Sequence, residues 1–258
     1  MILCIDVGNS NITYGLYKDK ELVCAFRAGT KEITCDEILK QDFLMGINQH
    51  GIHENDLECA IVDSVVPVID GLLLKLFEYL KIDYYFVTSN SPLGVTIDID
   101  NPQELGSDIL VGAFSAANKY MLPLLVVDMG TATTIALINE KKEIKGCIIY
   151  PGLLSSYNNL IKDTSKLVRA NVAMPVNVLG KNTIESMQSG MVYGTSCAVN
   201  GMINMIKEEY GLNNVNIIIT GGISSFMHQY ITDSIYDENL ILDGLYEIYN
   251  LVVKNKGW

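Results

Sequence analysis

Two short segments of the 258-residue chain place an aspartate, a glycine and several hydroxyl or amide side chains directly after an apolar run. The first segment begins at Asp6 and Gly8, and the second at Asp128 and Gly130. The polar residues that follow are Asn9, Ser10, Asn11 and Thr13 in the first segment, and Thr131, Thr133 and Thr134 in the second. Glycine permits a tight turn, and donors gathered in a turn form a pocket for phosphate oxygens.

The two aspartates suit a cation better than they suit phosphate. A carboxylate at Asp6 or Asp128 can bind Mg²⁺ or orient its waters, and the metal can then bridge to phosphate oxygens. Two such loops from two lobes could hold one triphosphate between them. The alternative is that each segment is an ordinary turn with a capping aspartate. We favour the phosphate loops because the same pattern occurs twice.

A third glycine element, Gly221-Gly222, follows an apolar run and precedes a predicted helix. It could admit the adenosine end of a nucleotide, although Gly-Gly between a strand and a helix is often only a turn. The chain has no GxGxxG segment, which argues against a dinucleotide-binding domain. The Gly180-Lys181 stretch is not a Walker A loop, because Pro175 stands where that motif needs glycine.

The surroundings of the two loops also repeat. The segment from Cys4 matches the segment from Val126, 122 positions later, in the order strand, Asp-x-Gly, polar turn, strand, hairpin and strand. The shift aligns Asp6 with Asp128, Gly8 with Gly130, Asn9 with Thr131, Asn11 with Thr133, and Glu21 with Glu143. A period of domain size predicts two similar lobes, which we place at residues 1–118 and 119–258.

The elements that must position these residues alternate between strand and helix patterns along both halves. Apolar strand patterns lie at 2–5, 12–17, 57–62, 124–127 and 215–219, and helical patterns at 36–47, 68–80, 182–210 and from about 243. Asn101-Pro102 predicts a helix start, since asparagine caps well and proline fits the first turn. The pattern indicates an α/β fold with mixed sheets flanked by helices.

Composition excludes several classes of partner. Hydrophobic residues are 49% and charged residues 19% of the chain, which is typical of a globular protein. The net charge of −12 disfavours nucleic acid and anionic membranes as partners. No apolar run is long enough to cross a bilayer, and the first residues read as a strand and not as a targeting signal. Six scattered cysteines without a CxxC fit a reducing cytoplasm, so we expect a cytoplasmic protein.

Four segments together carry a family resemblance. DVGNSNITYG, DMGTATT, GKNTIESMQSGMVYG and TGGIS, in this order and at these spacings, resemble type III pantothenate kinase. That family belongs to the superfamily of acetate and sugar kinases, heat-shock chaperones and actin. The resemblance covers nearly the whole chain and implies two duplicated ribonuclease-H-like lobes, each a mixed five-stranded sheet flanked by helices.

The resemblance also implies an activity and roles for individual residues. The enzyme would use ATP, Mg²⁺ and a monovalent cation (K⁺ or NH₄⁺) to phosphorylate pantothenate to 4′-phosphopantothenate, the first step of coenzyme A biosynthesis. Asp108 would be the catalytic base, and Asp128 would bind the monovalent cation. Residues implied to contact the nucleotide are Asp6 to Thr13, Thr131, Gly221 and Gly222, and those implied to contact the acceptor are Gly106, Ser107, Ile109 and Thr183. A homodimer with the acceptor pocket near its interface is also implied.

The acceptor side departs from the family pattern, and two of the departures stand at an arginine and a tyrosine of that pattern. The family motif Gly-Ala-Asp-Arg appears here with Ile109 in place of the arginine that should meet the substrate carboxylate, and Ile99 replaces a tyrosine. Two alternatives therefore stay open: a nucleotide-binding regulatory or non-catalytic relative, and a kinase of the same superfamily acting on another small hydroxyl acceptor. ATP binding without pantothenate-dependent ADP release would indicate the first, and a panel of acceptors would reveal the second.

Overall fold

The computed structural model describes residues 1–164, 167 and 171–254, which form two compact units. The first unit contains Met1–Lys119 together with 239–254, and the second contains Tyr120–Glu238. The closing segment therefore belongs to the first unit, whereas the sequence placed it in the second lobe. The reason is long-range packing, because the last helix lies on elements of the first unit.

The first unit is built on one mixed sheet with the strand order β3-β2-β1-β4-β5. Its strands are β1 (Ile2–Val7), β2 (Asn11–Lys18), β3 (Glu21–Gly29), β4 (Cys59–Ser64) and β5 (Asp83–Phe86). The first three strands form an antiparallel meander, while β4 and β5 join in parallel. Parallel strands need crossovers, which the intervening helices supply. A short strand β6 (Thr96–Ile97) precedes the third helix in the chain.

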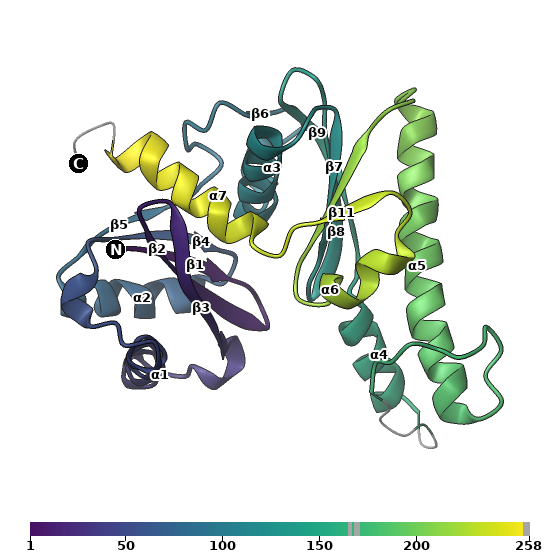
Figure 1. Ribbon diagram of the computed structural model, residues 1–258, viewed down its shortest axis with the longest axis horizontal. Helices are drawn as coiled ribbons and strands as arrows, with labels where there is room; N and C mark the ends of the chain where they lie inside the picture. The colour runs from purple at the N-terminus through teal and green to yellow at the C-terminus, as the bar shows by residue number, and fades with distance from the viewer. Residues whose placement is uncertain (165–166, 168–170, 255–258) are drawn as a thin grey trace. The chain divides into compact units, whose positions relative to one another are not determined.

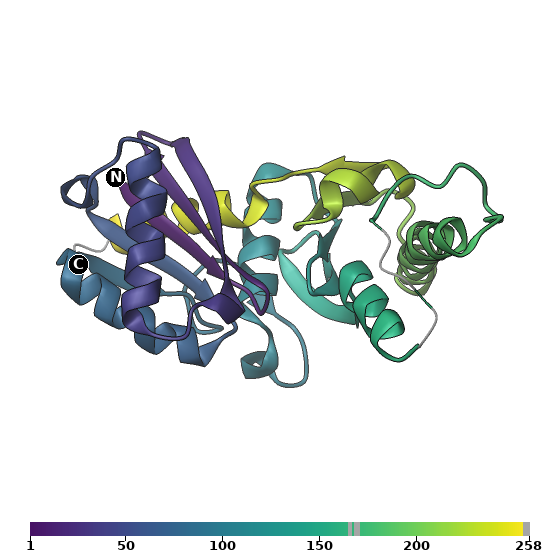
Figure 2. The ribbon, with the colours of Figure 1, turned by 90° about the horizontal axis from the view of Figure 1, so that it is seen from below.

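Helices cover both faces of this sheet, as Figures 1 and 2 show. They are α1 (Asp36–Gln49) and α2 (Pro67–Leu80) on one face, and α3 (Ser107–Lys119) and α7 (Leu240–Ile248) on the other. Leu3, Ile5 and Val7 of β1 face α1 and α2 in one apolar core. Since side chains alternate across a strand, Cys4 and Asp6 face α3 and α7.

Within the second unit, the strands follow the order β11-β10-β7-β8-β9, which repeats the arrangement of the first sheet. Its strands are β7 (Leu124–Met129), β8 (Ala132–Ile138), β9 (Glu143–Pro151), β10 (Asn216–Thr220) and β11 (Ser234–Tyr236). Its helices are α4 (Leu153–Lys162), the long α5 (Thr183–Glu209) and the short α6 (Ser224–Met227). The buried side chains of α4 and α5 share one core with alternate residues of β7 and β8.

Strand registers confirm the internal repeat and correct one detail of it. Asp6 pairs with Thr13 and Asp128 with Thr134, and both second strands carry an irregularity near their ends, at Leu16/Tyr17 and Leu137/Ile138. The second turn is one residue shorter than the first. The structural counterpart of Asn11 is therefore Ala132 and not Thr133. Asn11 and Ala132 both begin the second strand of their unit, and the carbonyl of each accepts a hydrogen bond from the turn glycine.

Most predicted elements are present, but the helix expected from Asn101 starts later. Pro102–Glu104 form only one 3₁₀ turn, and Leu105 and Gly106 separate it from α3. The Asn101 side chain donates to the Glu104 carboxylate instead of capping α3. All six cysteines are free thiols, as expected. None of the helices among the described residues combines the length and apolar character that a membrane crossing needs.

Candidate active site

The first predicted phosphate loop is a tight turn between β1 and β2. The Gly8 amide donates to the Asn11 carbonyl at 2.9 Å, which closes the turn. Thr30 holds the loop from outside: its hydroxyl donates to the Gly8 carbonyl at 2.7 Å and its amide to the Ser10 carbonyl at 3.0 Å. Asn9, Ser10 and Asn11 are exposed at the tip. The turn is thus fixed from the protein side and presents its tip residues to solvent.

A row of oxygen-bearing side chains crosses the sheet beside this loop. Asp6 of β1 pairs with Thr13 of β2 on one side and with Asp63 of β4 on the other. Because partners in register share a face, all three lie on the α3 and α7 side of the sheet. Asp63 is only 1% exposed. Two carboxylates and a hydroxyl are hard oxygen ligands, so this donor set fits Mg²⁺.

Asp63 is a candidate residue that the sequence did not single out. In the sequence, Asp63 is an acidic residue at the end of a buried strand, as Asp6 is, but no glycine follows it. An aspartate in that position is common at strand ends, so only its register beside Asp6 gives it significance.

The predicted base, Asp108, sits in the first turn of α3 in the same unit. The Ser107 hydroxyl donates to the Ser64 carbonyl at 3.1 Å and so fixes the start of α3 at the carboxyl end of β4. Ser64 is also the register partner of Val7, which precedes the first loop. The structure thus brings the predicted residues Gly106 to Ile109 to the sheet edge that carries Asp6 and Gly8.

Burial makes the carboxyl group of Asp108 harder to ionise. Desolvation of its half-buried carboxyl raises the pKa above its ordinary value, and the Ile109 amide, which donates to Oδ1 at 2.8 Å, opposes this shift only in part. A Cβ on Gly106 would overlap the same oxygen, so glycine is needed there for the carboxyl to lie where it does. A carboxylate with a raised pKa is a better proton acceptor than an ordinary aspartate.

The second loop has the same closure as the first. The Gly130 amide donates to the Ala132 carbonyl at 3.0 Å, and the Gly152 amide donates to the Thr131 carbonyl at 3.1 Å. Gly152 is the repeat counterpart of Thr30, so this bond to the loop is duplicated as well. Ser155 of α4 adds a hydroxyl bond to the Thr131 carbonyl at 2.7 Å. Thr131 itself is exposed.

Asp128 lies under the predicted glycine element of the second unit. Gly221 has φ of +97°, and a Cβ there would overlap both Asp128 Oδ1 and the Met129 backbone. Only glycine therefore permits this close approach. Asp128 also pairs in register with Thr134 and with Thr220, which is 1% exposed. One carboxylate among hydroxyl oxygens is a donor set that fits a cation of low charge.

The second unit therefore brings its predicted nucleotide and cation residues together, while Thr183 lies elsewhere in the unit. Thr183 begins α5, capped by Asn182, whose side chain accepts from the Glu185 amide at 3.0 Å as predicted. It lines a cavity of about 610 Å³ between α4 and α5. The residues that line it include the hydroxyl-bearing Tyr150, Ser156, Ser186 and Thr195 and the apolar Leu153, Met187 and Met191.

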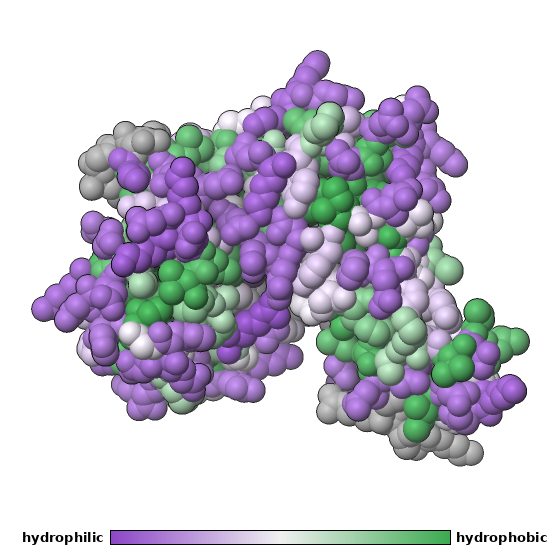
Figure 3. Space-filling view, in the orientation of Figure 1, coloured by the Kyte–Doolittle hydropathy of each residue, from purple (hydrophilic) through white to green (hydrophobic). Residues whose placement is uncertain are grey.

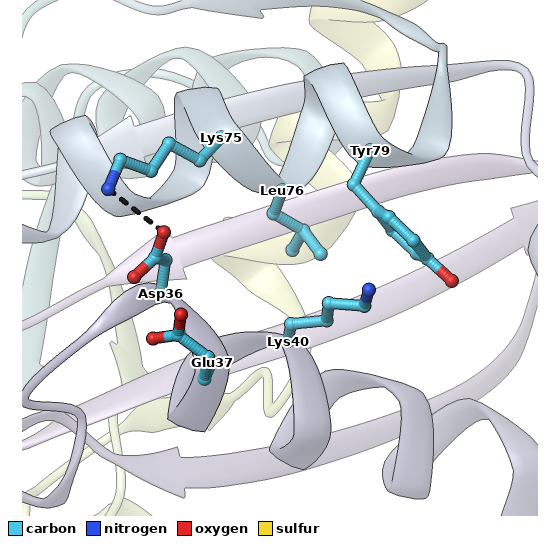
Figure 4. Close-up of a pocket in the computed structure, with 6 residues that line it drawn as sticks. All are labelled: Asp36, Glu37, Lys40, Lys75, Leu76 and Tyr79. Carbon is cyan, nitrogen blue, oxygen red and sulfur yellow. Dashed lines mark hydrogen bonds and ion pairs between the residues drawn. The ribbon is translucent and has the colours of Figure 1, made fainter.

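A smaller cavity of about 240 Å³ between α1 and α2 is shown in Figure 4. Lys75 forms an ion pair with Asp36 at 2.9 Å, and Lys40 lies 3.2 Å from the ring centre of Tyr79. The ligand atoms of Cys35, Asp36 and Glu37 lie within 4.8 Å of one another, but Asp36 is already bound to Lys75. These charges compensate one another, and the cavity contains no predicted site residue.

The fold and site geometry define the class of protein first. Within each unit the strands follow the same order, and an aspartate and a glycine turn follow the first strand, which is an actin-like fold. Solved structures agree at the level of fold. A Campylobacter jejuni protein assigned to the Baf family of transcriptional activators matches with a TM-score of 0.60 and 21% identity over 99% of this chain and 100% of that one. Component A of (R)-2-hydroxyglutaryl-CoA dehydratase from Acidaminococcus fermentans matches with a TM-score of 0.51 and 13% identity over 96% and 98%.

Sequence comparison then identifies the family. The family model described as type III pantothenate kinase matches residues 2–205. The type III pantothenate kinase of Citrifermentans bemidjiense is 41% identical, over 96% of this chain and 98% of that protein. That of Halalkalibacterium halodurans is 36% identical, over 96% and 98%. The chain belongs to the type III pantothenate kinase family.

Proposed function

We propose that this protein transfers the γ-phosphoryl group of ATP to pantothenate, giving ADP and 4′-phosphopantothenate at the start of coenzyme A biosynthesis. Family membership over nearly the whole chain carries this proposal. Two intact phosphate-type loops and a half-buried carboxyl with a raised pKa agree with it. Phosphoryl transfer depends mainly on positioning and charge neutralisation, with one base beside the nucleophile.

Asp108 is the base in this proposal. The primary hydroxyl oxygen of pantothenate attacks the γ-phosphorus, the bond from that phosphorus to the bridging oxygen of ADP breaks, and the hydroxyl proton passes to the Asp108 carboxylate. The Ser107 bond to the Ser64 carbonyl fixes the start of α3, where the Asp108 carboxylate lies. Burial raises the pKa of Asp108 and so strengthens it as a proton acceptor.

The two loops have different cation roles in the proposal. Asp6 would hold Mg²⁺, which when bound neutralises phosphate charge. Asp128 would hold a monovalent cation, K⁺ or NH₄⁺, beneath the Gly221 bend. The turn residues Gly8 to Asn11, together with Thr131, would contact phosphate oxygens, and Gly222 would adjoin the nucleoside. The exposed position of Asn9, Ser10 and Thr131 is consistent with these roles.

The acceptor pocket and the dimer are proposed together. Thr183 would contact the acceptor from the α4–α5 cavity. A second copy of the chain would pack on α5, where Gly190, Gly194 and Gly201 leave open space that lets another backbone approach closely. Apolar side chains are also exposed near the start of α5, where Figure 3 shows green patches on the second unit: Met174, Val176, Val178 and Leu179 are 58–87% exposed. Such surfaces are typical of subunit interfaces.

The test is an ADP-release assay with and without pantothenate, in K⁺ and in Na⁺, with mass detection of the phosphorylated product. Pantothenate-dependent ADP release that requires K⁺ is expected. The half-buried Ile109 favours a second candidate, a nucleotide-binding relative that does not turn over pantothenate, since it offers no charge to the substrate carboxylate. That candidate predicts ATP binding without pantothenate-dependent release of ADP. In that case, Ile109→Arg would restore turnover.

A further inference from the structure

The two units differ at one position of their matched rows of oxygen-bearing side chains. In the first unit the row is Thr13, Asp6 and Asp63, and in the second it is Thr134, Asp128 and Thr220. Asp63 and Thr220 occupy the same place, at the end of the parallel strand that pairs with the loop-bearing strand. The first row thus has two carboxylates, whereas the second has one.

The position of Asp63 couples it to the candidate active site. Neighbouring strands lie about 4.8 Å apart, so in-register side chains on one face are adjacent. Asp63 is the in-register neighbour of Asp6 and is almost completely buried. The next residue, Ser64, accepts the hydrogen bond from Ser107 that fixes the start of the Asp108 helix. A change of charge at Asp63 therefore acts at the point where the first loop and the base converge.

The chemistry of the two rows suits different ions. Two adjacent carboxylates repel each other unless a cation of high charge or a proton lies between them, and Mg²⁺ is bound in proteins by one or two carboxylates. The row of the second unit has one carboxylate and two threonine hydroxyls, so it carries half the negative charge of the first row. We infer that Asp63 is a second carboxylate of the divalent-cation site built on Asp6, and that its replacement by threonine in the second unit leaves that row for a monovalent ion. The inference rests on the proposed use of Mg²⁺ and ATP.

The measurement is the affinity for a non-hydrolysable ATP analogue, AMP-PNP, in EDTA and in saturating Mg²⁺, by calorimetry. In the wild type, Mg²⁺ is expected to strengthen binding. In Asp63→Asn, the factor by which Mg²⁺ strengthens binding is expected to fall at least about tenfold, as for other lost metal-site partners. Affinity in EDTA is expected to stay equal or to increase, because one negative charge near the phosphates is gone.

Two further variants make the result specific. Asp63→Thr copies the residue of the second unit and should behave like Asp63→Asn. Asp83→Asn, which makes the same change of charge at the opposite, exposed end of the sheet, should leave the effect of Mg²⁺ unchanged. EPR of bound Mn²⁺ should lose intensity in both Asp63 variants and keep it in Asp83→Asn.

The outcomes separate this inference from the proposed function. An unchanged effect of Mg²⁺ in Asp63→Asn overturns the inference, and so does a parallel loss of affinity in EDTA, which would indicate a purely structural role. If Asp6→Asn abolishes the effect of Mg²⁺ while Asp63→Asn does not, the kinase proposal stands and Asp63 has no part in the cation site. A wild-type protein that fails to bind AMP-PNP under both conditions refutes the proposed function itself.

Discussion

Replacing Asp108 by asparagine should separate catalysis from folding. Asparagine keeps the Oδ1 that accepts the 2.8 Å bond from the Ile109 amide, and it fits the space beside Gly106, so the start of α3 should be preserved. It removes the proton acceptor that the proposed chemistry assigns to this residue. We expect kcat to fall at least about a hundredfold, equivalent to about 2.7 kcal/mol of transition-state stabilisation. The AMP-PNP Kd should change by less than about threefold.

The raised pKa adds a second, opposite effect on stability. A carboxyl whose pKa is higher in the folded state contributes stability below its unfolded pKa and loses it as the pH rises through the folded pKa. At neutral pH the ionised, desolvated Asp108 therefore destabilises the wild type. We expect the melting temperature of Asp108→Asn to exceed that of the wild type at pH 7 to 8, and the difference to disappear at acidic pH.

Steady-state kinetics, AMP-PNP calorimetry and thermal melts across this pH range are the assays. Turnover within about fivefold of the wild type would refute the assignment of the base. A melting temperature that falls at pH 7 would show that the Asp108 carboxylate stabilises the fold, contrary to the burial argument.

Two further predictions concern other parts of the molecule. Gly221→Ala adds a Cβ that overlaps the Asp128 carboxylate, so the K⁺ concentration for half-maximal activity should rise about tenfold. The control is Gly211→Ala: Gly211 also has a positive φ, but a Cβ there meets open space, so this variant should lower only the melting temperature. Activation by K⁺ that is equal in the two variants would contradict the packing argument. Asp243→Asn removes the partly buried ion pair with Lys119 that joins α7 to α3, so urea unfolding should show a loss of about 1 kcal/mol. Its kcat should be unchanged, and a catalytic defect without a loss of stability would contradict this structural role.

Local patterns predicted the duplicated sheets because the strand and turn signals depend on neighbouring residues. The paired turns at Asp6 and Asp128 could therefore be predicted from the sequence. Their difference in length could not, because the one-residue deletion that precedes Ala132 is compensated farther along the hairpin. The assignment of α7 depends on packing against residues more than a hundred positions away, which no local pattern contains.

The candidate site likewise has residues that a sequence motif predicts and residues whose role depends on the three-dimensional structure. Asp108 was identified through a family motif, but the support that Ser107 gives to the start of its helix required three-dimensional coordinates. Asp63 had no motif and gains its significance only from its register beside Asp6. The helix predicted from Asn101 starts late because the Asn101 side chain binds Glu104 within a separate 3₁₀ turn.

The most direct test of the central claim is pantothenate-dependent turnover by the wild-type protein in K⁺, followed by mass detection of both products. We expect equal amounts of ADP and 4′-phosphopantothenate, with release of ADP near background when pantothenate is omitted. ADP release that does not depend on pantothenate, with no phosphorylated product, would contradict it.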